Sequence, residues 1–301
     1  MTDAVITYVN GTDPNWQAVW RRVVQGNPKF SAQNIAGARW RDYGTLPLLI
    51  RGVRRFMPFI HNIFVVVSGK SQAEYVPKDD GVVVVQDAEI VPQQLLPTFN
   101  STCIELFLYR IHGLSEQFIY FNDDMFPISP MKEDEFFRDG MPCLIVSPYT
   151  NPVKTQYACH LTNSLKAAAR AIGYERKGAA DFRFGHTAAP MLRSSWKRLW
   201  QTIPDDMMKS CSPFRTSYNI NQEVVNYLHF LEGRYVKARR KTKYAKASNT
   251  EKIAAILRAN RKCQVLCIND HSDVEFSDEL AAFIREELRE RIIFDAEPNE
   301  H

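Results

Sequence analysis

Two acidic residues follow an amide at the end of an apolar run in the middle of the chain. The run is Phe118–Phe121, and Asn122, Asp123 and Asp124 come directly after it. Because consecutive side chains are apolar, both faces are apolar, as in a central strand that helices cover. Carboxylates next to a packed core are costly unless a cation or a metal pairs with them. Ligands of open α/β sheets bind outside this end of the strands. The segment is therefore either a polar strand-to-loop turn or part of a binding site.

A second apolar run ends in the same way. Residues 264–268 are followed by Asn269 and Asp270. Two strands that end in an amide and an acid predict a shared polar edge, because the carboxyl ends of parallel strands meet on one side of a sheet.

Candidate cations and a histidine stand elsewhere in the chain. Arg39 and Arg41 flank a tryptophan, and Asp42 follows. This pattern fits a salt-bridged start of a helix, or a phosphate site, because the guanidinium fork matches phosphate oxygens. His186 and Arg215 each precede an expected helix. A lone histidine in such a position is more often structural than catalytic.

The elements that must position these residues predict an α/β fold. The β-rich runs at residues 4–9, 62–67 and 81–86 alternate with helical patterns at residues 45–56 and 102–112. Strands that helices separate favour a mostly parallel sheet. We therefore predict a Rossmann-like, glycosyltransferase-A-like sheet that is flanked by helices.

Turns after two of these strands add candidate binding residues. After the first, Asn10 and Gly11 predict a tight turn, and Asp13 predicts an N-cap before a proline. Free backbone N–H groups at such a helix start can bind an anion. After the second, Ser68 and Gly69 are similar to the end of a P-loop, but the first glycine of that motif is missing. We exclude a P-loop.

Composition and length bound the domain organisation. The chain has 301 residues, 45% of them hydrophobic and 24% charged, as in ordinary globular proteins. We predict an α/β core of residues 1–150 and 260–301, with residues 151–259 as a mainly helical insertion, or lid, that completes the site. A net charge of +4 is too small to argue for nucleic acid. Six cysteines without a CxxC pair fit a reducing compartment. We see no signal peptide and no transmembrane stretch, and expect a soluble cytoplasmic protein.

Residues 236–246 form the most basic stretch of the chain. The favoured interpretation is a solvated loop, and the alternative is a patch for an anionic acceptor or for membrane headgroups, which would allow peripheral membrane association. Its cations include Lys237, Arg239, Arg240, Lys241 and Lys243.

Several of these motifs together resemble the signature regions of Stealth-type phosphotransferases. Residues 6–14 are similar to the first region, residues 39–42 with 96–126 to the second, residues 186–215 to the third, and residues 267–270 to the fourth. The family includes bacterial capsular polysaccharide phosphotransferases and the catalytic subunit of the animal lysosomal-enzyme N-acetylglucosamine-1-phosphotransferase. The animal enzymes carry an acidic pair soon after the Arg-Asp motif, where this chain has Tyr-Gly-Thr. This difference leaves the sugar and the acceptor open.

The resemblance implies transfer of a hexose-1-phosphate, N-acetylhexosamine-1-phosphate in particular, from a UDP-sugar to an acceptor hydroxyl. A phosphodiester forms and UMP leaves. Under this hypothesis Asp123 or Asp124 holds Mg²⁺ or Mn²⁺ together with Asp270, and His186 or one of the paired acids accepts the proton. Two arginines, Arg41 and Arg215, neutralise the transferred phosphate. The donor cleft would be lined by Asn10, Gly11, Asp13, Asp42, Ser68, Gly69, Asn100, Asn122 and Asn269.

Two other functions stay open at this point. A conventional nucleotide-sugar glycosyltransferase would use similar acids at the ends of strands, but it would release UDP. A non-catalytic protein that binds anionic glycans through residues 236–246 would show no turnover. The nucleotide product distinguishes a glycosyltransferase from a phosphotransferase. Substitution of the acids at the strand ends distinguishes an enzyme from a non-catalytic binding protein, because only an enzyme would lose function.

Overall fold

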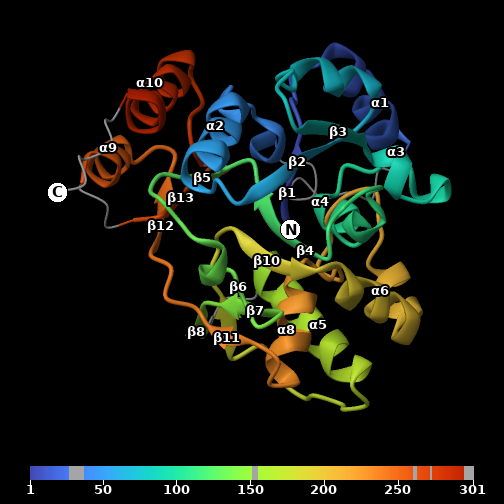
Figure 1. Ribbon diagram of the computed structural model, residues 1–301. Helices are drawn as coiled ribbons and strands as arrows, with labels where there is room; N and C mark the ends of the chain where they lie inside the picture. The colour runs from blue at the N-terminus through green and yellow to red at the C-terminus, as the bar shows by residue number, and fades with distance from the viewer. Residues whose placement is uncertain (27–36, 151–154, 260–262, 272, 295–301) are drawn as a thin grey trace.

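The computed structural model describes residues 1–26, 37–150, 155–259, 263–271 and 273–294 (Figure 1). A five-stranded sheet in the order β10-β4-β1-β2-β3 lies at its centre. Four strands are parallel, and β10 runs antiparallel to β4 at one edge. The predicted α/β fold with a mainly parallel sheet is confirmed. The strands of this sheet are β1 (Thr2–Tyr8), β2 (Ile60–Val67), β3 (Val82–Gln86), β4 (Gln117–Asn122) and β10 (Ala189–Leu192).

The register of the sheet brings polar strand ends together. Thr7 of β1 pairs with Asn122 of β4, and Tyr8 of β1 pairs with Val67 of β2. The residues that follow each strand, including Ser68, therefore lie along one edge of the sheet.

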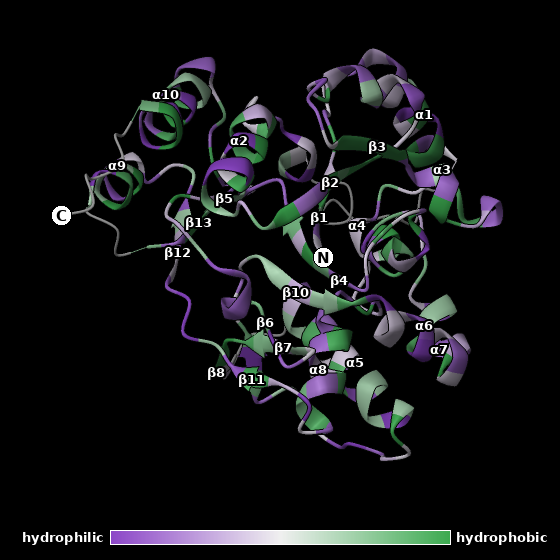
Figure 2. Cartoon of the chain, viewed as in Figure 1, coloured by the Kyte–Doolittle hydropathy of each residue, from purple (hydrophilic) through white to green (hydrophobic). Residues whose placement is uncertain are grey.

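Both faces of the sheet are covered, which explains the continuous apolar runs of its central strands. Ala4 and Ile6 of β1 pack in a core with α2 (Leu46–Phe56), α9 (Thr250–Arg258) and α10 (Asp278–Arg289). Val5, between them in the sequence, faces the opposite core. The helices of that second core are α4 (Ser101–Glu105), α5 (Gln156–Ala171), α6 (Arg193–Thr202), α7 (Pro204–Lys209) and α8 (Glu223–Leu231). Figure 2 shows apolar residues on the inward faces of these helices.

A second, three-stranded sheet extends the polar edge. Its order is β12-β13-β5, with β12 (Thr242–Lys246) parallel to β13 (Val265–Asn269) and β5 (Met125–Pro127) antiparallel to β13. Strand β5 begins directly after Asp124, and the Ile268 amide donates to the Asp124 carbonyl over 2.9 Å. The two Asn-Asp motifs are thereby brought side by side.

The segment after residue 150 departs in part from the predicted helical pattern. It contains the short strands β9 (Phe182–Phe184) and β10 as well as its helices. His186 lies between these two strands and Arg215 lies in the loop before α8, so the prediction that each directly precedes a helix was wrong. The helix expected over 102–112 ends at Glu105 and is followed by a 3₁₀ turn.

The remaining elements are short or peripheral. No helix in the described part of the chain is long and apolar enough to cross a membrane. The elements not yet given are α1 (Pro14–Gln25), α3 (Asp87–Ile90), β6 (Phe137–Arg138), β7 (Met141–Leu144), β8 (Val146–Pro148) and β11 (Val236–Lys237), with 3₁₀ turns at Gly37–Trp40, Lys70–Tyr75, Gln93–Leu95, Leu108–Arg110 and Glu133–Glu135, and a π-helical turn at Glu290–Phe294.

Candidate active site

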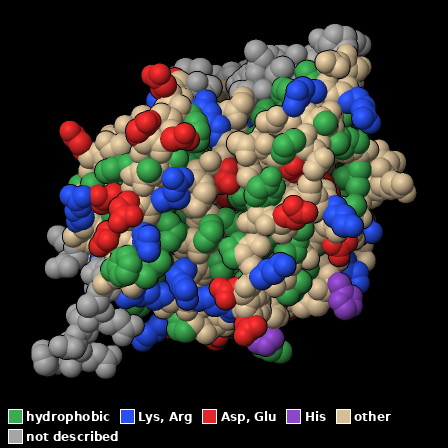
Figure 3. Space-filling model, turned by 90° about the horizontal axis from the view of Figure 1, so that it is seen from above, with side chains coloured by type: hydrophobic (Ala, Val, Ile, Leu, Met, Phe, Trp, Pro, Cys, Tyr) green, Lys and Arg blue, Asp and Glu red, His purple; other side chains and the backbone are tan. Residues whose placement is uncertain are grey.

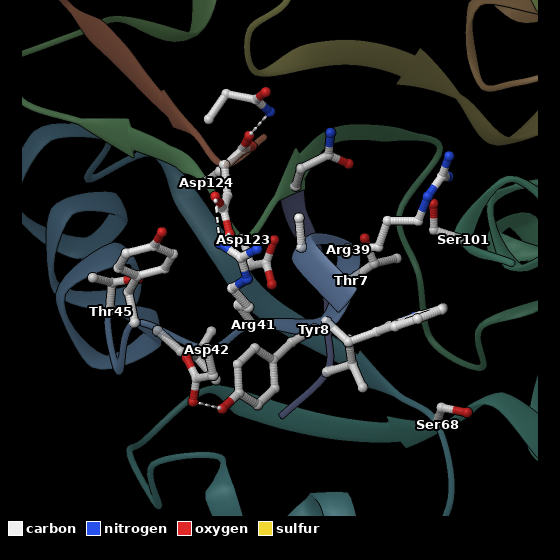
Figure 4. Close-up of a pocket in the computed structure, with 18 of the residues that line it drawn as sticks. Thr7, Tyr8, Arg39, Arg41, Asp42, Thr45, Ser68, Ser101, Asp123 and Asp124 are labelled. Atoms are coloured by element: carbon white, nitrogen blue, oxygen red, sulfur yellow. Dashed lines mark hydrogen bonds and ion pairs between the residues drawn. The ribbon is translucent and has the colours of Figure 1, made fainter. Parts of the chain in front are cut away.

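A cavity of about 440 Å³ opens at the carboxyl ends of β1, β2, β4 and β13. Its size is typical of a pocket for a small molecule or cofactor. All five residues predicted to be catalytic line it, although they come from distant parts of the sequence. Figure 4 shows Arg41, Asp123 and Asp124 on one side of the cavity and Ser68 and Ser101 on the other. The predicted residues along the wall are Arg41, Asp42, Ser68, Asn122, Asp123, Asp124, His186, Arg215, Asn269 and Asp270.

The two oxygens of Asp124 have different surroundings. Oδ2 accepts hydrogen bonds from Asn269 Nδ2 at 2.7 Å and from Cys267 Sγ at 3.3 Å, and lies 3.9 Å from His186 Nε2. Oδ1 is buried and has no hydrogen-bond partner in the described part of the chain. Burial alone would raise the pKa of Asp124, but His186 and the two donors together lower it, so the group is ionised. One oxygen is thus held by the protein and the other is available to a ligand.

His186 lies beside this carboxylate and forms an ion pair with it once the imidazole is protonated. Burial works to lower the pKa of His186, yet the hydrogen bond and the charge of Asp124 outweigh burial and raise the pKa. A histidine that a carboxylate orients in this way can act as a proton acceptor, because the acid stabilises the imidazolium that forms.

Asp123 is the second acid at this end of the cavity. Burial, followed by the nearby charges of Asp124 and Asp42, raises the pKa of Asp123 to about 8, and Arg215 acts in the opposite direction. Such a carboxyl can exchange a proton near neutral pH, or it can ionise when a cation enters the site.

Three arginines supply positive charge. Arg41 Nη1 lies 3.3 Å from both oxygens of Asp270 and donates to the Val274 carbonyl at 2.8 Å. Arg215 donates to the Ser101 hydroxyl at the start of α4. Each predicted arginine is therefore held in place by a protein acceptor.

Arg39, which the sequence analysis offered together with Arg41 as a cation of a phosphate site but did not assign a catalytic role, also lines the cavity. Its Nη2 donates to Gln156 Oε1 at 2.8 Å, while Nη1 is buried without a partner in the described residues. Burial and the charge of Arg215 lower the pKa of Arg39 to about 10. Two like charges and an unused donor at one wall are the features of a site that is completed by an anion.

The wall near Arg39 is aromatic. Trp16 and Phe99 line the cavity, with ring centroids 5.2 Å apart in an edge-to-face arrangement. Phe99 stacks on Phe214 at 5.2 Å with an interplanar angle of 14°. The cavity thus has an apolar aromatic wall, a row of arginines, and an acidic wall that contains Asp123 and Asp124.

Comparisons with known proteins agree with this arrangement. The family model described as "Stealth protein CR2, conserved region 2" matches residues 39–143. The capsular polysaccharide phosphotransferase LcbA of Aeromonas hydrophila is 30% identical over 246 residues, which cover 79% of this chain and 68% of that protein. The chain belongs to the Stealth family. A capsular polysaccharide phosphotransferase, WcwK of Streptococcus pneumoniae, is 26% identical over 91% of both chains. A receptor polysaccharide phosphotransferase, WefC of Streptococcus oralis, is 26% identical over 92% of this chain and 93% of its own.

Some residues predicted to line the cleft of this Stealth protein lie behind its wall. The Gly11 amide donates to the Trp40 carbonyl at 2.9 Å, and a Cβ at Gly11 would lie 2.1 Å from that oxygen. Asn10 Oδ1 accepts from the Thr12 amide, and Asp13 caps α1 as predicted. The glycine is needed for close packing against Trp40 and does not face the cavity.

Gly69 and Asn100 likewise support the wall from behind. The Gly69 amide and the Ser68 hydroxyl both donate to Asp87, a buried acid after β3 that the sequence analysis missed. Asn100 caps α4 and its amide donates to the Ser212 carbonyl, which connects α4 to the loop of Arg215. Neither residue is among the described residues that line the cavity.

Substitution Asp13→Ala tests the supporting role of this turn. Asp13 accepts from the Asn15 amide, from Gln72 Nε2 and from the Ser71 hydroxyl. We expect the free energy of unfolding to fall by about 2 kcal/mol, while turnover stays within about 3-fold of wild type. Glu175→Ala, which removes an exposed loop acid, should change stability by less than about 0.5 kcal/mol. Chemical denaturation measures the change in the free energy of unfolding. A large rise in KM for the donor would instead place Asp13 in the binding site.

Glu105 is a buried residue that supports the cationic wall. Thr102 and Glu105 have the spacing of a capping box, but Asn100 is the cap, and Glu105 is buried among other partners. Glu105 accepts from the Gln222 amide and from the hydroxyls of Ser101 and Tyr120. Because Ser101 also accepts from the Arg215 guanidinium, Glu105 helps to position the cationic wall.

Proposed function

We propose that this Stealth protein transfers a hexose-1-phosphate from a UDP-sugar to an acceptor hydroxyl, with N-acetylhexosamine-1-phosphate as the group transferred. The phosphotransferase names of the relatives support the reaction class. The layout of the cavity supports a donor that lies with its nucleobase at the aromatic wall and its phosphates toward the acids. The observation that carries the proposal is the convergence of acids, a histidine and three arginines on one cavity from five separate stretches of the sequence.

The donor is expected to lie along the cavity from the aromatic wall to the acids. Trp16 and Phe99 offer rings for the nucleobase, since flat aromatic faces favour stacking. Arg39 and Arg215 then meet the two phosphates, because their forks match phosphate oxygens and their mutual repulsion is relieved by an anion. The phosphorus that is attacked would lie toward Asp124 and His186.

A divalent cation suits the acidic wall. The fit rests on the buried Asp124 Oδ1, an ionised oxygen without a protein partner. Mg²⁺ is usually held by one or two carboxylates together with phosphate oxygens and water. Asp124 would supply one ligand, and Asp123 or Asp270 a second. When bound, the ion would offset negative charge on the pyrophosphate.

In the described residues, a group of potential ligand atoms that lie within 4.8 Å of one another comes from Asp124, His186 and Cys267. Neither Asp123 nor Asp270 is in this group, so Asp124 is the acid on which the proposed ion site depends. Burial raises the pKa of the Cys267 thiol well above its usual range, so the thiol stays protonated. Cys267 therefore acts as a donor to Asp124, and the oxygen ligands favour Mg²⁺ or Mn²⁺ over a soft metal.

The proton of the acceptor hydroxyl goes to His186. The acceptor oxygen attacks the β-phosphorus, the bond from that phosphorus to the bridging oxygen breaks, and UMP leaves with the electron pair. Asp124 holds the imidazole and stabilises its positive charge after it takes the proton. Arg215 stabilises the charge on the transferred phosphoryl oxygens.

The nucleotide product tests the proposal. We expect incubation with a panel of nucleotide sugars and hydroxyl acceptors to release a nucleoside monophosphate and to form an acid-labile phosphodiester. Release of UDP would instead support a conventional glycosyltransferase. No nucleotide release with any donor, together with glycan binding that is lost when Lys241 and Lys243 are neutralised, would support a non-catalytic binding protein.

A further inference from the structure

We infer that the exposed cations beside β12 bind the acceptor as a growing polyanionic glycan and guide its end into the cavity. We name these cations, Lys237, Arg239, Lys241 and Lys243, the basic edge. The inference rests on the proposed function, because repeated sugar-1-phosphate transfer gives a chain with one negative phosphodiester for each unit added.

The basic edge leads to the cavity. Strand β12 is an edge strand that pairs with β13 on one side. It runs parallel to β13, and Lys246 at its end is in register with Asn269, which lines the cavity. The chain from Lys237 to Lys243 could extend over at most about 20 Å, so only an oligomeric acceptor could contact all of it. In Figure 1 the segment runs from β11 along the outside of the molecule to β12.

Tyr244 connects this edge to the reacting end. Its hydroxyl donates to Asn269 Oδ1 at 3.3 Å and shares a 2.5 Å hydrogen bond with His271. The Asn269 amide in turn donates to Asp124 at 2.7 Å. Tyr244 is 42% exposed, so part of its ring is open to a ligand. An acceptor that lies on the basic edge would therefore meet Tyr244 before it reaches Asp124.

The charge of the basic edge is not neutralised by the protein. All four side chains are exposed, and none forms an ion pair within the described residues. Lys246 is excluded because it pairs with Asp273. Acidic and basic side chains are interspersed on the face shown in Figure 3, which looks down on the molecule from the top of Figure 1.

Arg240 does not belong to this surface, contrary to the sequence-based prediction. It is 6% exposed, its guanidinium lies 4.2 Å from the centre of the Phe136 ring, and it donates to the carbonyls of Glu135 and Cys143. Arg240 therefore anchors the segment to the protein, and its neighbours in the sequence project outward.

An anionic membrane would also attract these lysines. The position of β12 favours the glycan, because this strand continues from Lys243 to Lys246, which is in register with Asn269 at the cavity. A glycan with several phosphodiesters places charge along the row, whereas a single-sugar acceptor reaches the cavity alone.

Acceptor length tests the inference. The probes are two glycosides of the sugar that wild-type protein accepts, one with a single sugar and one with several phosphodiester-linked repeats. We expect wild type to prefer the longer probe by about 10-fold in kcat/KM, and a variant with all four cations changed to Gln to lose most of this preference. High salt should weaken the wild-type preference, because the Debye screening length falls to about 3 Å at 1 M salt. The matched control changes four exposed lysines elsewhere to Gln, which removes the same charge, and should keep the preference: Lys78, Lys177, Lys197 and Lys209.

The outcomes separate this inference from the proposed function. An equal preference in wild type and in the four-site variant would overturn the inference while leaving phosphodiester transfer in place. Failure of wild type to form a phosphodiester with either probe would overturn both. Vesicles of phosphatidylglycerol and phosphatidylcholine address the membrane. Loss of vesicle binding in the variant without a change in acceptor preference would assign the basic edge to a membrane and contradict the inference.

Discussion

Asp124→Asn is expected to lower kcat by at least about 1000-fold, because it removes the charge on which two functions depend. The ionised carboxylate holds His186 through Oδ2 and leaves Oδ1 for a ligand. The substitution keeps the size of the side chain, so the fold should be retained. Initial rates of nucleotide release, with thermal unfolding measured in parallel, check both statements.

Cys267→Ala is the matched control for Asp124→Asn. Its thiol donates to the same oxygen of Asp124, over 3.3 Å, but carries no charge in the proposed reaction. We expect a loss of less than about 10-fold, since a neutral hydrogen bond contributes only about 1 kcal/mol. Near-normal turnover of Asp124→Asn would refute the role given to this acid.

Arg215→Ala should reduce kcat by at least about 100-fold with a smaller change in KM, because its charge is most needed when negative charge develops in the transition state. The guanidinium is placed at the cavity by Ser101, which Glu105 also contacts. Arg215→Lys should recover only part of the loss, since an ammonium group cannot bind two phosphate oxygens in a fork.

Arg170→Ala serves as the control for the arginine. Arg170 forms an ion pair with Asp206 at 2.8 Å and is not among the residues that line the cavity. Its loss should change turnover by less than about 2-fold. If Arg215→Ala behaved like Arg170→Ala in steady-state kinetics, the phosphate site would have to lie elsewhere.

The central strands and their polar ends could be predicted because the signal is local. The apolar run before Asn122 predicts that both faces of β4 are buried, and the apolar run before Asn269 predicts the same for β13. Both strands are buried in the structure. The rule that ligands collect at the carboxyl edge of one parallel sheet does not by itself explain why the two ends meet, because β4 and β13 belong to different sheets. They meet through β5, which pairs with β13 directly after Asp124.

Other features could not be predicted because they depend on contacts between distant residues. The local sequence at Gly11 is the same whether the glycine faces a phosphate or packs on Trp40, and only the three-dimensional contact decides. Arg240 resembles its basic neighbours in the sequence, but Phe136, 104 positions earlier, removes it from the surface. Glu105 has the spacing of a cap yet is held by Tyr120 and Gln222.

The core and insertion boundaries, at residues 150 and 260, stay predictions. The structure shows that β10 of the intervening segment is an edge strand of the central sheet and that His186 lies three residues before the start of this strand. A histidine placed by the sheet itself is held more firmly than one on a separate lid. This placement explains how a residue so far from Asp124 in the sequence can reach it.

The fate of the donor's β-phosphate tests the central claim most directly. The protein is incubated with acceptor and a UDP-sugar that carries a radioactive label in the phosphate next to the sugar, and the products are separated. Our account predicts that the label moves to the acceptor in a phosphodiester while unlabelled UMP is released. Recovery of the label in UDP, with an unlabelled glycosidic product, would contradict it.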